Sequence, residues 1–364
     1  MKKIFLFIVF SVIVFYANAQ NTETDTLHLF LPHVTTIQET DTIYVHVRET
    51  IYVNCAEANG DGTLNGLFSV SETTKVRFSQ GNLQFNATQG EHITADGNTH
   101  TGTWRFAANQ YDIIGSNNKK ISSSYEGWID LFMWATSGYD NTTNDPYAVN
   151  YQPWSTSSSI VNNSYNYAGY GPSTNMLDNS LIGTSANYDW GVYNSITNGG
   201  NQAGMWRTLT KDEWVYLFYG RTNAEKLFGL GRVNGINGTI LLPDDWITPD
   251  DLTFLPSTER DLEVNQYNKY SNTSSSGENY SNNTYSASEW QKMEAAGAVF
   301  LPAAGRRYLY NNQSVVNDII YSGMYWASTR VDKWQAYILY FYSSYLSANT
   351  SGECHVGCSV RLVR

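Results

Sequence analysis

The residues Trp206-Arg207-Thr208-Leu209-Thr210-Lys211-Asp212-Glu213-Trp214 hold the clearest structural signal in this 364-residue chain. Thr210 and Glu213 match a capping box, in which each side chain accepts a hydrogen bond from the other residue's backbone N–H. Leu217 and Phe218 extend the apolar side of the segment at helical spacing. A helix is therefore expected to begin directly after Thr210.

A second capping box stands at Ser286 and Glu289, and Gly297 supplies a stop for the helix that follows. Elsewhere the chain alternates short apolar or aromatic runs with loops rich in Gly, Asn and Ser. Two helices among many short strands indicate an α+β domain. The runs expected to be strands are residues 76–78, 83–85, 104–106, 298–301, 325–328, 337–342 and 359–363.

Several polar segments are expected to be loops. Residues 141–185 and 267–285 are long, polar and without clear periodicity, and the segment Gly229-Leu230-Gly231 is expected to form a turn. We expect Asp244-Asp245 to be a solvated pair. His92 and His100 are likewise expected to be solvated in a polar loop, with no role in catalysis.

The N-terminus matches a secretory signal peptide, predicted to span residues 1–19. Two lysines precede the apolar residues 4–15, and Ala17-Asn18-Ala19 is an A-x-A cleavage site. The apolar stretch is shorter than the roughly 20 residues of a membrane span. A retained anchor is the alternative. After cleavage no transmembrane segment is expected.

The next segment, residues 20–58, is expected to be an extended spacer that precedes one domain at residues 59–364. It contains a rough repeat, Asp-Thr-Ile-Tyr-Val at 41–45 and Glu-Thr-Ile-Tyr-Val at 49–53, whose alternation favours strands. A stalk, an assembly strand and a disordered linker all fit this segment.

Composition argues against some functions. The formal charge is −11 and no cluster of Lys and Arg exists, so nucleic acid is not an expected partner. Aromatic residues reach 15%, including 27 Tyr, a composition typical of adaptable binding surfaces. Three cysteines are too few and too unevenly placed for a disulfide framework.

Three segments resemble known families. Residues 206–214 resemble the W-R-x-[LP]-T-x-x-E-W segment of formylglycine-generating enzymes and their relatives. Residues 325–329 resemble the Y-W-S-S-T strand of the Fibrobacter succinogenes major paralogous domain, and residues 357–363 resemble that group's terminal G-x-S-V-R-L-V. The resemblance spans about residues 66–364. It implies a C-type-lectin-like fold and a source among the Bacteroidetes.

The C-terminal tail also resembles the variable region of proteins diversified by retroelements, which share this fold. Their templates carry many Asn codons, and mutation at adenines converts these to codons for Tyr, Ser, Thr and several other residues. Between Ala336 and Gly357, most positions outside an apolar frame hold Asn or a residue within reach of such a codon, although Glu353 does not. The resemblance implies that the tail forms a ligand-binding face.

Strand geometry suggests the same division of the tail. In a strand over residues 337–342, Leu339 and Phe341 face one side, while Ile338, Tyr340 and Tyr342 face the other. One side would be core and the other an aromatic contact surface. A strand buried on both faces is the alternative. The candidate ligand-binding residues are Trp334, Ile338, Tyr340, Tyr342, Tyr345, Ser347, Asn349 and His355.

Catalytic chemistry has little support in the sequence. Formylglycine-generating enzymes use a cysteine pair, but Cys354 and Cys358 differ from it in spacing and in position relative to the terminal motif. A zinc site built from these cysteines and His355 lacks a credible fourth ligand. The calcium signatures E-P-N and Q-P-D are absent. We therefore expect no catalytic residue, no metal site and no cofactor.

Together these observations predict a secreted or surface-displayed, non-enzymatic ligand-binding protein. Its partner would be a protein or a glycan at the cell exterior. One alternative is an oxidase of the formylglycine-generating type that uses the cysteine pair. Another is a structural subunit of a surface fibre, with residues 20–54 supplying an assembly strand.

Overall fold

The computed structural model describes residues 61–139, 151–155, 180–256, 278–311, 313–332, 334–343 and 345–364, together with the backbone of several short strands elsewhere. The chain divides into two compact units, Met1–Tyr52 and Val53–Arg364. The predicted signal peptide lies outside the described residues, as do most of the expected loops at residues 141–185 and 267–285. No helix among the described residues is long and apolar enough to cross a membrane.

In the first unit, two short antiparallel pairs of strands are described. Strands β1 (Leu31–His33) and β4 (Val45–Val47) pair with each other, as do β2 (Ile37–Gln38) and β3 (Asp41–Thr42). Extended pairing fits the alternating Thr, Ile and Val of this segment. The second half of the predicted repeat, residues 49–53, lies outside the described residues.

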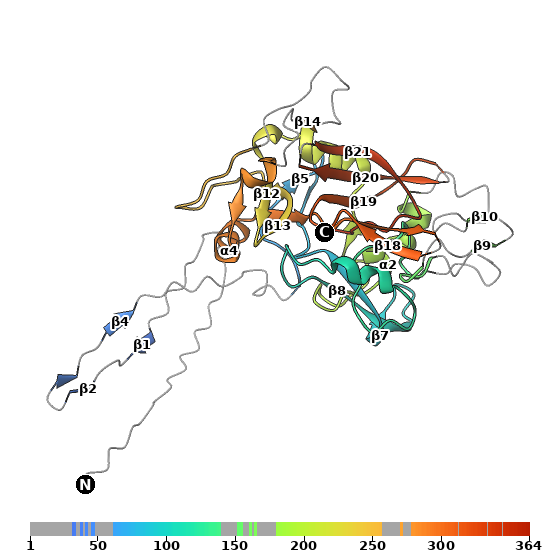
Figure 1. Cartoon of the computed structure of the whole chain (residues 1–364), viewed down its shortest axis with the longest axis horizontal. Helices are drawn as coiled ribbons and strands as arrows, with labels where there is room; N and C mark the ends of the chain where they lie inside the picture. The colour runs from blue at the N-terminus through green and yellow to red at the C-terminus, as the bar shows by residue number, and fades with distance from the viewer. Residues whose placement is uncertain are drawn as a thin grey trace, which may run out of the picture. The chain divides into compact units, whose positions relative to one another are not determined.

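The second unit contains two four-stranded sheets. The C-terminal sheet has the order β14-β21-β20-β19 and is antiparallel throughout (Figure 1). The other has the order β15-β12-β13-β16, with only β15 parallel to its neighbour. Their strands are β12 (Phe228–Val233), β13 (Ile236–Leu241), β14 (Tyr270–Ser271), β15 (Thr284–Tyr285), β16 (Val299–Pro302), β19 (Ser322–Arg330), β20 (Gln335–Tyr342) and β21 (Tyr345–Glu353).

Two-stranded antiparallel pairs complete the strands of this unit. The longest is the pair formed by β7 and β8. The strands of these pairs are β5 (Phe68–Ser69) with β6 (Lys75–Val76), β7 (Leu83–Ile93) with β8 (Thr99–Phe106), β9 (Ile160–Val161) with β10 (Ser164–Tyr165), β11 (Arg207–Thr208) with β22 (Leu362–Val363), and β17 (Arg306–Tyr310) with β18 (Gln313–Asn317).

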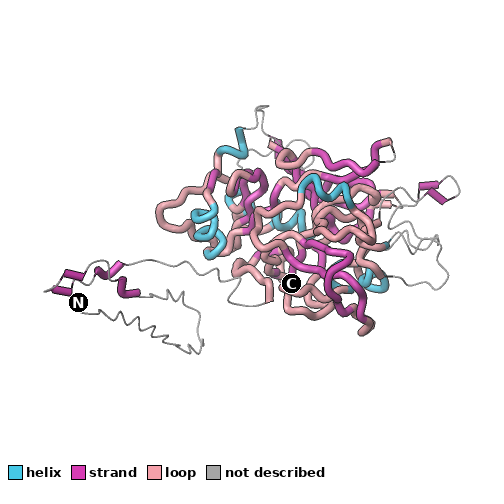
Figure 2. The backbone as a smooth tube through the Cα atoms, turned by 60° about the horizontal axis from the view of Figure 1, so that its bottom comes forward, coloured by secondary structure: helices cyan, strands magenta, loops and turns pink. Residues whose placement is uncertain are grey.

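Helices are few and short, which confirms the predicted α+β class (Figure 2). The α-helices are α2 (Trp190–Tyr193), α3 (Lys211–Val215) and α4 (Ala287–Ala295). The 3₁₀-helices are η1 (Gly115–Lys120), η4 (Gly183–Tyr188), η6 (Ala224–Lys226) and η7 (Glu278–Ser281), and η5 (Tyr216–Gly220) is a short π-helix.

Both predicted capping boxes are confirmed. Before α3, Glu213 N–H donates to Thr210 Oγ1 over 3.1 Å and Thr210 N–H donates to Glu213 Oε2 over 2.8 Å. Before α4, Ser286 and Glu289 repeat the arrangement. Gly297 follows α4 with φ of +98°, a conformation that favours glycine and ends the helix.

The C-terminal sheet separates two hydrophobic cores, because successive side chains in a strand point to opposite faces. One face of β19 and β20 contributes to the first core, which includes Phe68, Phe78, Trp214, Phe218, Tyr325, Leu339 and Phe341. The other face contributes to the second core, which includes Phe85, Trp104, Phe132, Trp134, Trp190, Trp206, Trp326 and Ile338. A third core, between α4 and the other sheet, includes Leu227, Ile240, Trp290, Met293 and Phe300.

Two expectations for loop segments are wrong, one of them in part. Gly229 and Gly231 lie inside strand β12, where a Cβ on either residue would come within 2.8 Å of a neighbouring carbonyl oxygen. These glycines therefore allow close packing of the backbone rather than a turn. The solvated pair is half right: Asp245 is exposed, whereas Asp244 is half-buried and forms ion pairs with Arg221 at 3.2 Å and with Lys75 at 3.0 Å.

The loop expected around the two histidines is also wrong, because both lie in strands, whereas the expected solvation is wrong for His92 and right for His100, which is exposed. His92 and His100 are cross-strand partners in the β7–β8 pair, and their rings stack with centroids 5.8 Å apart. His92 is buried, and its Nδ1 donates to the Gly102 carbonyl oxygen over 2.8 Å. Burial lowers the pKa of His92, so the neutral ring is favoured.

Candidate ligand-binding surface

Strand alternation divides β20 as the sequence predicts. Leu339 and Phe341 are fully buried in the first core, whereas Tyr340 packs partly against the second core. Both neighbouring strands hydrogen-bond to β20, so its backbone is fixed along most of its length. The side chains of β20 are therefore attached to a backbone that is held in place on both sides.

Three tyrosines gather where β20 ends and β21 begins. The rings of Tyr340, Tyr342 and Tyr345, called here the tyrosine cluster, have centroids 5.2–5.7 Å apart. Tyr342 and Tyr345 are register partners, and their rings stack with an interplanar angle of 17°. All three side chains are half-buried, so part of each side chain remains accessible.

The tyrosine cluster borders polar groups. Arg306 and Asp318 form an ion pair at 3.2 Å, and the charges of both act on the Tyr340 hydroxyl. Burial, reinforced by the neighbouring Tyr342, raises the pKa of Tyr340. The Tyr345 hydroxyl lies 3.4 Å from Thr350 Oγ1. This surface therefore combines aromatic rings with neutral hydroxyls that can donate and accept hydrogen bonds.

Three predicted site residues lie between the ends of the β20–β21 hairpin and contribute little surface. Ile338 is 3% exposed in the second core, and Ser347 is 2% exposed. Asn349 is half-buried, its N–H donates to Ser347 Oγ, and its Oδ1 has no hydrogen-bond partner among the described residues. Ile338 is buried in the second core and the next residue, Leu339, in the first. This part of β20 is therefore buried on both faces, as the alternative interpretation of the sequence proposed.

Trp334 and His355 lie at the opposite end of the hairpin from the tyrosine cluster. Seven residue steps separate Gln335 from Tyr342, and at about 3.3 Å per step this corresponds to about 23 Å. The structure therefore brings the predicted residues together in two groups rather than on one continuous surface. Buried positions separate the two groups.

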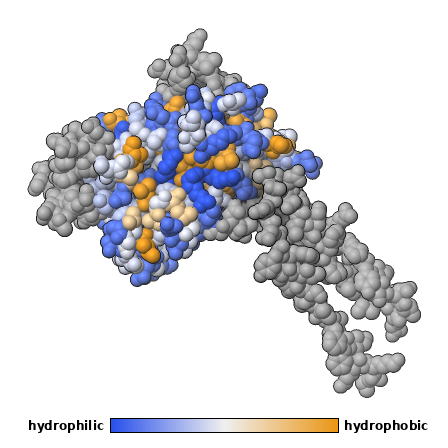
Figure 3. All heavy atoms as spheres, turned by 180° about the vertical axis from the view of Figure 1, so that it is seen from behind, coloured by the Kyte–Doolittle hydropathy of each residue, from blue (hydrophilic) through white to orange (hydrophobic). Residues whose placement is uncertain are grey.

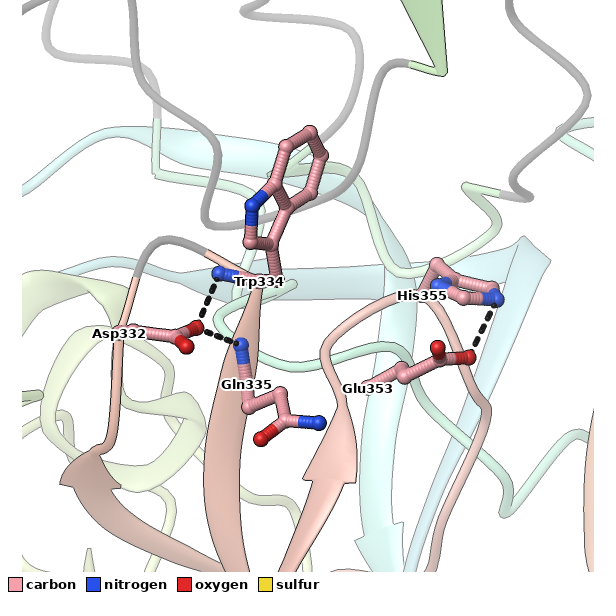
Figure 4. Close-up of a pocket in the computed structure, with 5 residues that line it drawn as sticks. All are labelled: Asp332, Trp334, Gln335, Glu353 and His355. Atoms are coloured by element: carbon pink, nitrogen blue, oxygen red, sulfur yellow. Dashed lines mark hydrogen bonds and ion pairs between the residues drawn. The ribbon is translucent and has the colours of Figure 1, made fainter.

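A pocket of about 400 Å³ lies at the Trp334 end and is called here the Trp334 pocket (Figure 4). The described residues in its walls are Asp332, Trp334, Gln335, Glu353 and His355. Only two of these residues were predicted as site residues. The others have no local sequence signal, because the pocket forms where the β19–β20 turn meets the far end of β21.

Hydrogen bonds fix the backbone of the Trp334 pocket. Asp332 Oδ1 accepts from the N–H groups of Trp334 at 2.7 Å and Gln335 at 2.9 Å. The Trp334 carbonyl accepts from Cys354 N–H at 2.8 Å, which ties the turn to the end of β21. Across the pocket, His355 Nε2 lies 3.3 Å from Glu353 Oε2. Burial lowers the pKa of His355, although the charge of Glu353 acts in the opposite direction.

The cysteine pair lies in the second core. Cys354 and Cys358 are both unbonded to another sulfur and fully buried. Burial raises the pKa of Cys354 to about 12 and raises that of Cys358 as well. The nucleophilic thiolate is therefore strongly disfavoured at both positions. Among the described residues, no group of three His, Cys, Asp or Glu side chains is placed to hold a metal ion.

A second cavity, of about 170 Å³, lies beside the β7–β8 pair. His92, His100, Phe85 and Trp154 contribute to its walls, and the rings of Phe85 and Trp154 stack 6.1 Å apart. The sequence gives no signal for this cavity, because Trp154 is far along the chain from the histidines.

The face in Figure 3 is mainly hydrophilic, and its hydrophobic residues form small groups. Comparison with known protein families, with curated proteins and with solved structures finds no match to this chain.

Proposed function

We propose that this protein is an exported, non-enzymatic ligand-binding protein that contacts its partner through the tyrosine cluster. The observation that carries the proposal is the placement of three half-exposed, mutually packed tyrosine rings on a sheet with a core on each face. The partner is a protein or a glycan at the cell exterior.

Physical reasons favour binding at this surface. A tyrosine offers a large contact area with few rotatable bonds, so little side-chain entropy is lost when it binds. Packing of the three rings on one another restrains them before the partner arrives. Such preorganisation lowers the cost of association. The hydroxyls beside the Arg306–Asp318 pair add polar contacts that can select a partner.

Export and family resemblance belong to the same proposal. The signal peptide at residues 1–19 directs the chain out of the cytoplasm, and the segment at residues 20–58 serves as a spacer. The domain has a C-type-lectin-like fold whose C-terminal tail is diversified. The tyrosine cluster lies within that tail, which supports this interpretation.

The oxidase alternative is disfavoured by the cysteines. Enzymes of that type need a reactive thiolate, whereas both thiols here are fully buried and have raised pKa values.

Binding measurements on protein and glycan arrays test the proposal. The wild-type protein should bind at least one array component saturably. The Y340A/Y342A/Y345A variant should lose about 30-fold or more in affinity, since truncating even one anchor residue costs about 2 kcal/mol. The Y340F/Y342F/Y345F variant keeps the rings and serves as the matched control. Retention of wild-type affinity by the folded alanine variant would show that the cluster is not the binding surface.

Sequencing this locus in sibling isolates tests the diversification. Differences should concentrate between about residues 321 and 356 and should spare Leu339, Phe341 and Leu346, which form part of the first core. Identical sequences there, beside differences elsewhere in the chain, would contradict diversification and leave the binding proposal standing.

A further inference from the structure

We infer that the turn between β18 and β19 displays Ile320 and Tyr321 as further contact residues for the partner, and that this partner is a protein rather than a glycan. The turn comprises residues 318–321 and is called here the Ile320 turn. The inference rests on the proposed function, because it extends the surface of the tyrosine cluster and narrows the class of partner that this surface binds.

The backbone at Ile320 is strained. Its φ is +57°, in the left-handed region, where the Cβ of an L-residue lies too close to the following carbonyl oxygen. A β-branched residue is a rare outlier in this region. Among the described residues, eight other than glycine have positive φ, and six of these are Asn or Asp, which tolerate it. The remaining two are Ala135 and Ile320.

Burial does not account for the strain at Ile320. Ala135 is 2% exposed and packs in the second core, whereas Ile320 is 46% exposed and Tyr321 is 66% exposed. Neither residue of the turn belongs to one of the three cores. The strained backbone therefore holds an apolar and an aromatic side chain in solvent. Strain of this kind is concentrated at sites of binding and catalysis.

Hydrogen bonds from other elements hold the Ile320 turn in this conformation. The Ile320 N–H donates to the Ala303 carbonyl oxygen over 2.8 Å, and the Ile320 carbonyl accepts from Asn237 Nδ2 over 2.9 Å. The Tyr321 carbonyl accepts from the Tyr280 hydroxyl over 3.1 Å. The two side chains are therefore displayed from a backbone that is fixed before a partner arrives, which lowers the cost of association.

The Ile320 turn adjoins the tyrosine cluster. Strand β19 begins at Ser322, whose register partner is Tyr342 of the cluster, so Tyr321 lies beside the end of β20. Burial raises the pKa of Tyr280, and the charges of Tyr340 and Tyr321 act in the same direction. Both of these tyrosines thus approach one buried hydroxyl. The turn and the tyrosine cluster therefore form one continuous surface.

The composition of this extended surface favours a protein partner. Tyrosine and arginine are enriched in the central contacts of protein interfaces, and this surface holds four tyrosines beside Arg306. The ion pair of Arg306 with Asp318 carries no net charge, so apolar and aromatic contacts dominate. The hydroxyls of a glycan would gain no hydrogen bond from the Ile320 side chain, whereas an apolar side chain of a protein would be removed from water against it.

Affinity measurements on protein and glycan arrays test the inference. The probe is the array component that the wild type binds most tightly, which should be a protein. I320N and Y321A should each lose about fivefold or more in affinity for it, the loss typical of a contributing interface residue. I320V keeps a β-branched apolar side chain and should retain most of the affinity. I247N is the matched surface control, because Ile247 is 80% exposed, and it should bind as the wild type does.

Thermal melting separates a contact role from a structural one. Asparagine adopts positive φ more readily than isoleucine, so the relief of strain should offset the apolar contact that is lost, and I320N should keep the wild-type Tm. A Tm for I320N well below that of the wild type would show that Ile320 is retained for packing, and would overturn the inference.

The inference and the proposed function fail separately. Wild-type affinity in I320N and Y321A, beside lost affinity in Y340A/Y342A/Y345A, would reject the Ile320 turn and sustain the tyrosine cluster. Saturable binding to glycans alone would sustain the proposed function and reject the protein partner. Absence of saturable binding to either array would overturn both.

Discussion

The adjacent β20 residues Phe341 and Tyr342 should differ strongly in how much folding stability is lost when each is replaced by alanine. Phe341 is fully buried in the first core, and its ring stacks on Tyr325 at 6.2 Å with an interplanar angle of 16°. The same ring covers Gly323, where an added Cβ would collide with it. Tyr342 is half-buried and belongs to the tyrosine cluster.

The magnitudes follow from these environments. Replacing a fully buried Phe by Ala lowers the free energy of unfolding by about 3–5 kcal/mol. The tight packing around Gly323 leaves little room for the resulting cavity to collapse. We therefore expect F341A to lose about 4 kcal/mol of stability. Y342A removes a ring that is already partly in water and should cost about 1 kcal/mol. For the unit Val53–Arg364, an unfolding entropy of about 2.1 cal/mol/K per residue means that each kcal/mol lowers the Tm by about 1.5 °C. F341A should therefore melt about 6 °C below the wild type.

Urea denaturation followed by tryptophan fluorescence measures both variants. F341L serves as the control, since it keeps most of the buried volume and should lose clearly less stability than F341A. Partner binding provides the complementary measurement, in which Y342A should lose affinity and folded F341L should not. Similar stability losses for F341A and Y342A would refute the assignment of one face of β20 to the core and the other to contact.

Two further outcomes are expected. Iodoacetamide at mildly alkaline pH should leave Cys354 and Cys358 unmodified in the folded protein and should label both after denaturation. Mass mapping of the labelled peptides measures this. Rapid labelling of either cysteine in the native state would contradict their burial. For Asp130 and Asp189, burial raises the pKa from 3.8 to about 6, so the folded state takes up protons before the unfolded state and stability should rise as the pH falls from 7 towards 4. D130N/D189N should lack this contribution in a Tm–pH profile, and an unchanged profile would show that neither pKa is raised.

Local patterns in the sequence predicted several elements correctly. Both helices begin where their capping boxes stand, because a cap depends on residues only three positions apart. The inward-facing Leu339 and Phe341 follow from strand alternation, which is also local. The α+β class follows from two capping boxes among many short strand-like runs. In each case the interacting atoms lie within a few residues of one another.

Other expectations failed where distant segments decide the environment. Gly229 and Gly231 are expected in a turn on local grounds, yet neighbouring backbone approaches them so closely that glycine is needed inside a strand. His92 is buried because the β7–β8 pairing brings it against His100 and Phe85. Asp244 is half-buried because Arg221 and Lys75, both distant in the chain, form ion pairs with it.

The sequence by itself determined which residues of the tail can share a strand face, because side-chain direction repeats every two residues. Only the tertiary structure decided how much of that face is exposed. The second core covers Ile338, while the three rings of the tyrosine cluster remain accessible at one end of the hairpin. The Trp334 pocket exists only because strand pairing brings the end of β21 to the turn before β20, and no local pattern encodes that contact.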